Sequence, residues 1–291
     1  MLPIRFDAST RKMADVESID QLLDLWLHGK SPQSQRAYRS DIKQFLDFVE
    51  LKPLTQVTLN DVQRWANVLV IEGKSSATQN RKLSAIKSLL RFGHRIGYLP
   101  FDVGNPVELP KTKNTLAERI LSQLEVMTMI ALEPSQRNKL LLQFLYITGA
   151  RVSEISAIKW RDIKANGERG QATLFGKGSE TRIVPIPSGL FQRLLSLKGE
   201  QSQDEPLFKS RKHGALQPNQ IREIVAIAGK RAGIEGNVSP HWLRHSHASH
   251  SLDRGAPIQL VQNTLGHKSV AVTTRYLHAR PGDGSSLYLP E

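Results

Sequence analysis

The first hundred positions carry apolar residues at the spacing of α-helices. One apolar cluster runs from Ile19 to Trp26, and Ser31-Pro32 then interrupts the pattern. A second cluster follows at i, i+4, i+7 and i+8 across residues 38–46. Similar spacing fills Thr58–Glu72 and a segment that begins near Ser76. Because no strand-like alternation occurs before residue 100, the pattern predicts a small bundle of four helices.

The rest of the chain mixes both periodicities. The apolar run Leu140–Tyr146 ends at Thr148-Gly149, and helical spacing resumes from Val152 to Trp160. Alternation at 172–175 and 182–186 flanks Gly176-Lys177-Gly178-Ser179-Glu180. These patterns predict helices joined to a β-hairpin that carries Lys177 at its tip.

Three helices are predicted towards the end of the chain. Ser239-Pro240 supplies an N-cap and a first-turn proline for a helix from His241 to about Leu252. A further helix spans about Ile258–Leu265, and the last begins near Ser269 and carries Tyr276.

The fold predicted from these elements is mainly α, with a small β-sheet confined to the C-terminal domain. Residues 1–14 are polar and poorly patterned, which indicates an N-terminal arm, and residues 15–108 form the helical domain. Proline, glycine and basic residues at 109–116 and just before it indicate a linker. The mixed domain then covers residues 117–291.

The charge of the chain favours a polyanionic partner. The formal net charge is +13, and residues 109–291 carry 25 basic against 15 acidic side chains, compared with 15 against 12 in residues 1–108. Lysine and arginine that neutralise phosphates release condensed counterions, so nucleic acid is the natural partner. A basic solvated surface has the same composition, and charge alone does not identify an activity.

Other features exclude several classes of protein. The chain has no cysteine, which rules out disulfides, thiolate nucleophiles and cysteine-ligated zinc. No apolar stretch approaches the roughly 18 residues of a membrane-spanning helix, and the N-terminus lacks the apolar core of a secretory signal. We therefore expect a cytoplasmic protein that has no contact with membranes.

Arg151 is the first candidate for a phosphate-binding residue. It follows Thr148-Gly149-Ala150 at the start of a predicted helix, where its guanidinium and nearby backbone donors can bind two phosphate oxygens. Glu154 lies one turn later on the same face and can support a neighbouring cation or cap the helix. An arginine in this setting is also common on ordinary protein surfaces.

His241 and Arg244 are three residues apart on one predicted helix, so both side chains can reach one small anion. Arg244 would be a second phosphate ligand, and His241 would hydrogen-bond a phosphate oxygen or handle the proton of an attacking hydroxyl. Imidazoles at 241 and 245 also have the i, i+4 spacing of a zinc site. The sequence nearby offers no acidic third ligand, so we expect no metal.

Three further residues complete the candidate set. Lys177 in its glycine-flanked turn can enter a DNA groove and protonate a leaving oxygen, and His267 follows a predicted helix end at Gly266. Tyr276 is the candidate nucleophile, because nearby arginines would stabilise both its anion and a pentacoordinate phosphorus. Taken alone, each of these residues also has an ordinary role as a turn or packing residue.

Together, these positions resemble the tyrosine recombinases, also called the phage integrase family. The matching segments, in chain order, are Thr148-Gly149-Ala150-Arg151-Val152-Ser153-Glu154, Gly176-Lys177-Gly178, His241-Trp242-Leu243-Arg244-His245, Leu265-Gly266-His267-Lys268-Ser269 and Thr273-Thr274-Arg275-Tyr276. The N-terminal half is similar to the family's helical core-binding domain. The two-domain layout looks most like that of the Xer-type recombinases and of simple transposon or integron recombinases.

The resemblance implies a SAM-like core-binding domain and an α+β catalytic domain that close around double-stranded DNA, with a homotetramer acting on two sites. Arg151 and Arg244 would hold the scissile phosphate, with His241 and His267 assisting. Lys177 would protonate the 5′ oxygen while Tyr276 becomes joined to the 3′ phosphate. The phosphotyrosine bond conserves the energy of the broken linkage, so resealing through a Holliday junction needs no cofactor.

The resemblance also implies contacts between DNA and basic residues of the N-terminal half, namely Arg36, Arg81, Lys82 and Lys87. Two alternatives share part of this pattern. A type IB topoisomerase uses the same chemistry but relaxes supercoils, and an architectural protein binds DNA without cutting it. A metal-dependent nuclease fits less well, because the region of the site lacks a carboxylate cluster.

Overall fold

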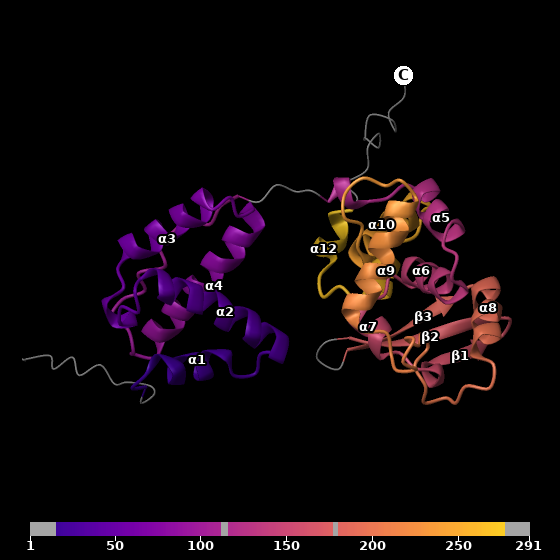
Figure 1. The fold of residues 1–291 in the computed structure, drawn as a ribbon, viewed down its shortest axis with the longest axis horizontal. Coiled ribbons are helices and arrows are strands. Elements are labelled where there is room, and N and C mark those ends of the chain that lie inside the picture. The colour runs from indigo at the N-terminus through magenta and orange to yellow at the C-terminus, as the bar shows by residue number, and fades with distance from the viewer. Residues whose placement is uncertain (1–15, 112–115, 177–179, 277–291) are drawn as a thin grey trace, which may run out of the picture. The chain divides into compact units, whose positions relative to one another are not determined.

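The computed structural model describes residues 16–111, 116–176 and 180–276. The chain splits into two compact units, Met1–Lys113 and Asn114–Glu291 (Figure 1). The predicted arm at 1–14, part of the predicted linker and Lys177 lie outside the described residues. Across the described residues, no helix combines the length and the apolarity needed to cross a bilayer.

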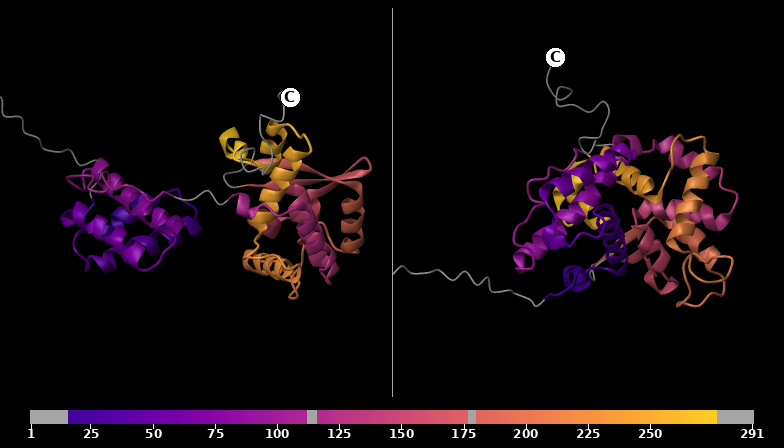
Figure 2. Two further views of the ribbon diagram at one scale, coloured as in Figure 1. Left: turned by 90° about the horizontal axis from the view of Figure 1, so that it is seen from above. Right: turned by 60° about the vertical axis from the view of Figure 1, so that its left-hand side comes forward.

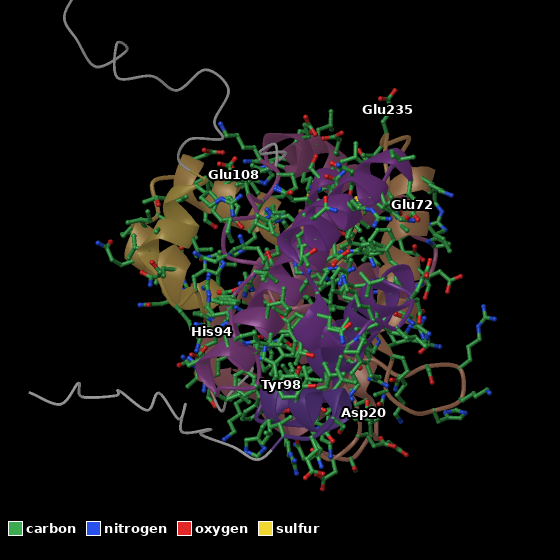
Figure 3. The ribbon with its side chains drawn as sticks, turned by 90° about the vertical axis from the view of Figure 1, so that its left-hand side faces the viewer. Asp20, Glu72, His94, Tyr98, Glu108 and Glu235 are labelled. Atoms are coloured by element: carbon green, nitrogen blue, oxygen red, sulfur yellow. The ribbon has the colours of Figure 1, made fainter. Side chains whose placement is uncertain are left out.

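The N-terminal unit is the predicted bundle of helices. Its elements are α1 (Ile19–Leu27), α2 (Pro32–Phe48), the 3-10 turn η1 (Leu54–Gln56), α3 (Leu59–Ile71) and α4 (Ser76–Arg95). Asp20 lies in the first turn of α1 and Glu72 is the C-cap of α3. Both residues are labelled in Figure 3.

Local sequence sets where these helices begin. The Ser31 hydroxyl accepts a hydrogen bond from the Ser34 amide ahead of Pro32, and Thr58 forms a capping box with Asp61 at the start of α3. The apolar faces of the four helices then pack into one core, in which Ile42 and Leu69 are completely buried. The prediction of four helices is confirmed.

The described residues of the C-terminal unit join helices to a small sheet. Its helices are α5 (Gln123–Ala131), α6 (Gln136–Thr148), α7 (Val152–Ala157), α8 (Ser188–Lys198), α9 (Pro218–Arg231), α10 (Pro240–Asp253), α11 (Ile258–Leu265) and α12 (Val270–Thr274), with 3-10 turns η2 (Ala117–Arg119) and η3 (Trp160–Asp162). The strands β1 (Ile163–Asn166), β2 (Arg169–Phe175) and β3 (Thr181–Ile186) pair antiparallel in the order β1-β2-β3. The predicted fold class is confirmed.

The apolar run at 140–146 forms the central helix of this unit. Leu140, Leu141, Leu142, Phe144 and Leu145 are fully buried, because α6 is covered by other elements around most of its circumference. It packs against α5, α8, α10 and β3. Figure 2 shows the helices and the sheet of this unit from two further directions. The predicted hairpin is present, with Phe175 of β2 paired to Thr181 of β3.

Several element boundaries differ from the sequence prediction. The helix predicted to reach Trp160 ends at Ala157, because Ile158 is extended and Trp160 donates its amide to the Glu205 carbonyl at 3.1 Å. Strand β1 was not predicted, since its residues are largely exposed and show little alternation of burial. Helix α12 ends at Thr274, so Tyr276 lies just beyond the helix and not within it.

Candidate active site

Arg151 owes its position to the turn between α6 and α7. Gly149 ends α6 in the left-handed region at φ 57°, where a side chain would be strained, and a Cβ there would lie 2.6 Å from Leu265 Cδ2. Glycine is therefore required, and the turn places Arg151 at the N-cap of α7. The Arg151 guanidinium donates to Glu154 Oε1 at 3.0 Å and to the Gly266 carbonyl at 2.8 Å.

Glu154 is buried and is held by a second arginine, Arg182 of β3. Arg182 binds both Glu154 carboxylate oxygens, at 2.7 and 2.8 Å, and its Nε donates to the Thr264 carbonyl at 2.7 Å. Burial alone raises the pKa of Glu154, but hydrogen bonds from Arg182 and from the Arg151 backbone hold that pKa below its usual range. Glu154 is thus a buried carboxylate that joins two arginines from different elements.

Arg182 was not among the residues predicted from the sequence. The strand pattern could have revealed Arg182, because it lies on the same face of β3 as the buried Val184 and Ile186. A charged residue at an inward position requires a buried partner, and Glu154 is that partner.

Arg244 lies almost completely buried on α10, next to these groups. Its Nη1 donates to the Gly149 carbonyl at 2.5 Å and its Nη2 to the Leu265 carbonyl at 2.6 Å. Burial, followed by the charges of Arg151 and Arg182, lowers the pKa of Arg244 to about 10, which leaves it a cation at neutral pH. The described cluster therefore contains three guanidinium groups for the single carboxylate of Glu154.

An open pocket of about 360 Å³ lies at this cluster. Its lining includes Arg151, Arg182, Gly266, His267 and Lys268. Gly176 and Glu180, which flank the undescribed residues 177–179, also line it. The pocket thus combines guanidinium groups with an exposed lysine and an imidazole, which is the lining expected of a site for an oxyanion.

Tyr276 is brought into the same region by a small hydrophobic cluster. Its ring is 3 % exposed and packs with Leu252, Val261 and Leu265 of α10 and α11. Burial raises the pKa of the Tyr276 phenol, although Arg244 and Arg275 act in the opposite direction. At neutral pH the free protein therefore holds Tyr276 as a protonated phenol.

Two histidines contact Tyr276 directly. The His267 ring is stacked on it at 6.3 Å between centroids, and His267 Nδ1 lies 2.9 Å from Thr273 Oγ1. His245 Nδ1 lies 2.7 Å from the Tyr276 hydroxyl oxygen. Burial and the surrounding cations lower the pKa of both His245 and His267 to about 4, so both rings are neutral at pH 7.

His241 is exposed in the first turn of α10, with its ring 6.3 Å from that of His245. Desolvation, followed by the charges of Arg244, Arg222 and Arg151, lowers the pKa of His241. The structure therefore brings Arg151, Arg244, His241, His267 and Tyr276 into one region of the C-terminal unit, together with Glu154. Lys177 lies outside the described residues.

The remaining histidines of α10 have other partners. His247 Nδ1 donates to the Tyr146 carbonyl at 2.9 Å, and His250 Nδ1 lies 2.8 Å from the Tyr146 hydroxyl. Among the residues the structure describes, no three histidine, aspartate or glutamate side chains gather as a metal site.

The four basic residues predicted to contact DNA in the N-terminal unit differ in their surroundings. Arg36 is exposed on α2, and Arg81 is half-exposed and paired with Asp41. Lys87 donates to backbone carbonyls of Asn105 and Val107.

The prediction for Lys82 is wrong, because this side chain is buried. Its ammonium lies 2.7 Å from Gln44 Oε1 and 3.3 Å from Asp41 Oδ1. These partners belong to α2 and Lys82 to α4, so its charge is used to join two helices and is not presented to solvent.

Comparisons with known proteins agree with this geometry. Residues 117–282 match the family described as Phage integrase family, and residues 19–97 match the phage integrase N-terminal SAM-like domain. The tyrosine recombinase XerC of Corynebacterium glutamicum is 31 % identical over 281 residues, covering 94 % of this chain and 89 % of that protein. The tyrosine recombinase XerD of Bifidobacterium longum is 32 % identical over 284 residues, covering 90 % and 91 %.

A likeness of fold extends to solved structures. The crystal structure of a lambda integrase (75–356) dimer bound to a COC′ core site superposes with a TM-score of 0.76 at 19 % identity, covering 92 % of this chain and 98 % of that one. The chain belongs to the phage integrase family. The prediction of a tyrosine recombinase acting in site-specific recombination is confirmed by these relatives, and the topoisomerase and architectural alternatives are not favoured.

Proposed function

We propose that this chain cuts and rejoins double-stranded DNA through Tyr276, with the pocket beside Arg151 and Arg244 holding the scissile phosphate. The observation that carries the proposal is that Arg244 lies close enough to act both on Tyr276 and on the other members of a cluster of three arginines and one carboxylate. The excess of positive charge is largely desolvated, which is costly unless an anion compensates it. A phosphodiester supplies that anion.

The two proposed phosphate ligands gain their orientation from the protein itself. The Arg151 guanidinium is fixed by Glu154 and by the Gly266 carbonyl, and Arg244 by two backbone carbonyls. Preorganised donors of this kind stabilise charge that develops on the phosphorane without reorganising during the reaction. Arg182, bound to Glu154, acts on the phosphate through its charge and through the position it gives Arg151.

The proposed reaction exchanges one phosphodiester bond for another. The Tyr276 phenol gives its proton to a neighbouring base as its oxygen attacks phosphorus, the bond from phosphorus to the 5′ oxygen breaks, and Lys177 gives that oxygen a proton. The 3′ phosphate stays bonded to Tyr276 until a 5′ hydroxyl of the partner duplex, giving its proton to Lys177, attacks it and releases Tyr276, which regains its proton from the neighbouring base. His241 and His267 would hydrogen-bond phosphate oxygens during both steps.

The same proposal assigns the two units their roles. Residues 15–108 would be the core-binding domain, 109–116 the linker and 117–291 the catalytic domain, with Arg36, Arg81 and Lys87 facing the DNA backbone. The protein would act in the cytoplasm as a homotetramer on two DNA sites. Structures similar in fold include a lambda integrase tetramer bound to a Holliday junction, which supports this assembly.

Covalent trapping tests the proposal. Wild type and Tyr276→Phe are expressed, adducts that survive denaturation are isolated, and the attached DNA is sequenced. We expect adducts from wild type alone, at one locus, with protein on the 3′ end. Adducts from Tyr276→Phe would refute the role of Tyr276, and adducts scattered over the genome would favour a topoisomerase.

A further inference from the structure

The contact between His245 and Tyr276 has no part in the roles given above. His245 Nδ1 is 2.7 Å from the Tyr276 hydroxyl oxygen, which is a short O–H···N distance. Among the described residues, His245 is the one hydrogen-bond partner of that hydroxyl. His241, which the sequence suggested for handling this proton, is instead exposed one turn earlier on α10.

The protonation states allow the Tyr276 hydroxyl to donate this hydrogen bond to His245. The Tyr276 phenol is protonated, because burial raises its pKa, and His245 is neutral, because its pKa is lowered to about 4. A neutral imidazole has one N–H and one acceptor nitrogen, so in the tautomer protonated at Nε2 the phenol donates and Nδ1 accepts. In that tautomer the lone pair of Nδ1 is directed at the proton that Tyr276 must lose before its oxygen can bond to phosphorus.

We infer that His245 is a further catalytic residue, which takes the Tyr276 proton during attack and returns it during resealing. In the forward step the phenol proton moves to Nδ1 while the phenol oxygen bonds to phosphorus. In the reverse step the imidazolium gives its proton back to the departing phenol. This role rests on the proposed function of Tyr276 and leaves His241 to bind a phosphate oxygen.

The cations around His245 explain why the transfer would follow binding of DNA. The groups that face His245 are His241 and Arg244 of α10, Arg119 of η2, and Arg275 and Tyr276 after α12. Burial first, and then the positive charge of His241 when protonated and of the three arginines, keep the His245 ring neutral in the free protein. A bound phosphodiester brings a compensating negative charge and the phosphorane adds more, so imidazolium becomes favourable as attack proceeds.

The test measures single-turnover formation of the covalent adduct on a nicked duplex that carries the sequence recovered from wild-type adducts. His245→Asn keeps an amide close to the position of Nδ1 but cannot take a proton, and His245→Phe removes the hydrogen bond. His213→Asn, in an exposed loop, is the control for the same chemical change. DNA binding and thermal unfolding are measured for each variant, so that misfolded proteins are recognised.

We expect both His245 variants to bind DNA normally and to cleave about 100- to 10,000-fold more slowly than wild type, the range for loss of a general base. Cleavage by His245→Asn should also rise steeply with pH, since hydroxide then removes the phenol proton, whereas wild type should vary little near neutrality. A His245→Asn enzyme with wild-type rate and pH profile would overturn the inference, since it would show that the contact only positions Tyr276. Absence of adduct from wild type, or its presence in Tyr276→Phe, would refute the proposed function itself.

Discussion

Replacing Arg182 by methionine should destabilise the C-terminal unit more than any loss of a surface charge. Its side chain is 12 % exposed and that of Glu154 is 1 % exposed, and the replacement removes three hydrogen bonds, two to the carboxylate and one to the Thr264 carbonyl. Removing one member of a buried ion pair costs about 3–5 kcal/mol, because the other charge remains desolvated. Arg151 still contacts Glu154, so we expect the lower part of that range for Arg182→Met.

The loss of unfolding free energy in Arg182→Met is measured by native-state hydrogen exchange in the full chain, followed in peptides from residues 163–186. Exchange reports the unfolding free energy of each unit separately, whereas a single melting curve would mix the two units. Arg161→Met is the matched control, since Arg161 pairs with Asp204 at 2.6 Å but the two side chains are 58 % and 71 % exposed. An exposed pair contributes at most about 1 kcal/mol.

A double-mutant cycle then separates the pair from its surroundings. If the two charges stabilise each other, Glu154→Met and Arg182→Met together should cost less than the sum of the single changes, by about 0.5–3 kcal/mol. A cost for Arg182→Met no larger than that of Arg161→Met would contradict the reasoning, and strictly additive costs would do the same.

Two further predictions concern a glycine and a carboxylate. Gly149→Ala should cost more stability than Gly167→Ala, because both glycines have positive φ but only at Gly149 would the Cβ meet another atom, Leu265 Cδ2 at 2.6 Å. Strain alone costs about 1–2 kcal/mol, so equal losses in urea unfolding would show that the contact is harmless. The pKa of Asp61 is lowered from an ordinary 3.8 to about 2, and hydrogen bonding from Lys52 is the largest cause. The ionised Asp61 therefore stabilises the fold fully above pH 3.8, and this stabilisation is lost as the pH falls towards 2. The stability advantage of wild type over Asp61→Asn should therefore shrink between about pH 4 and pH 2. A constant advantage would contradict the lowered pKa of Asp61.

Periodicity predicted the helical bundle and the hairpin because both depend on local spacing. An apolar stripe at helical intervals must be buried somewhere, whatever the partner elements are. Boundaries were less certain, because they depend on distant residues. The helix that begins at Val152 ends early since the amide of Trp160 pairs with Glu205, and no local feature of the sequence marks that pairing.

The site residues likewise divide into those that local sequence predicted and those that depend on distant contacts. Arg151, Arg244 and Tyr276 stand in recognisable local frames, so their types and order in the sequence were enough to suggest a phosphate site. Lys82 was wrongly predicted to contact DNA because the sequence shows a basic residue on a helix but not the buried Asp41 beside it. Arg182 was missed for the same reason, as Glu154 is 28 positions away in the chain.

The sequence by itself determined the helical and mixed domains, the excess of basic residues and the set of groups able to bind and attack a phosphate. Only the tertiary structure decided which of those groups touch. It placed Arg182 against Glu154, and it placed the Tyr276 hydroxyl within hydrogen-bond distance of His245, which the sequence had not suggested. The physical reason is that hydrogen bonds and desolvation act over a few ångströms, and chain order does not specify which distant side chains come that close.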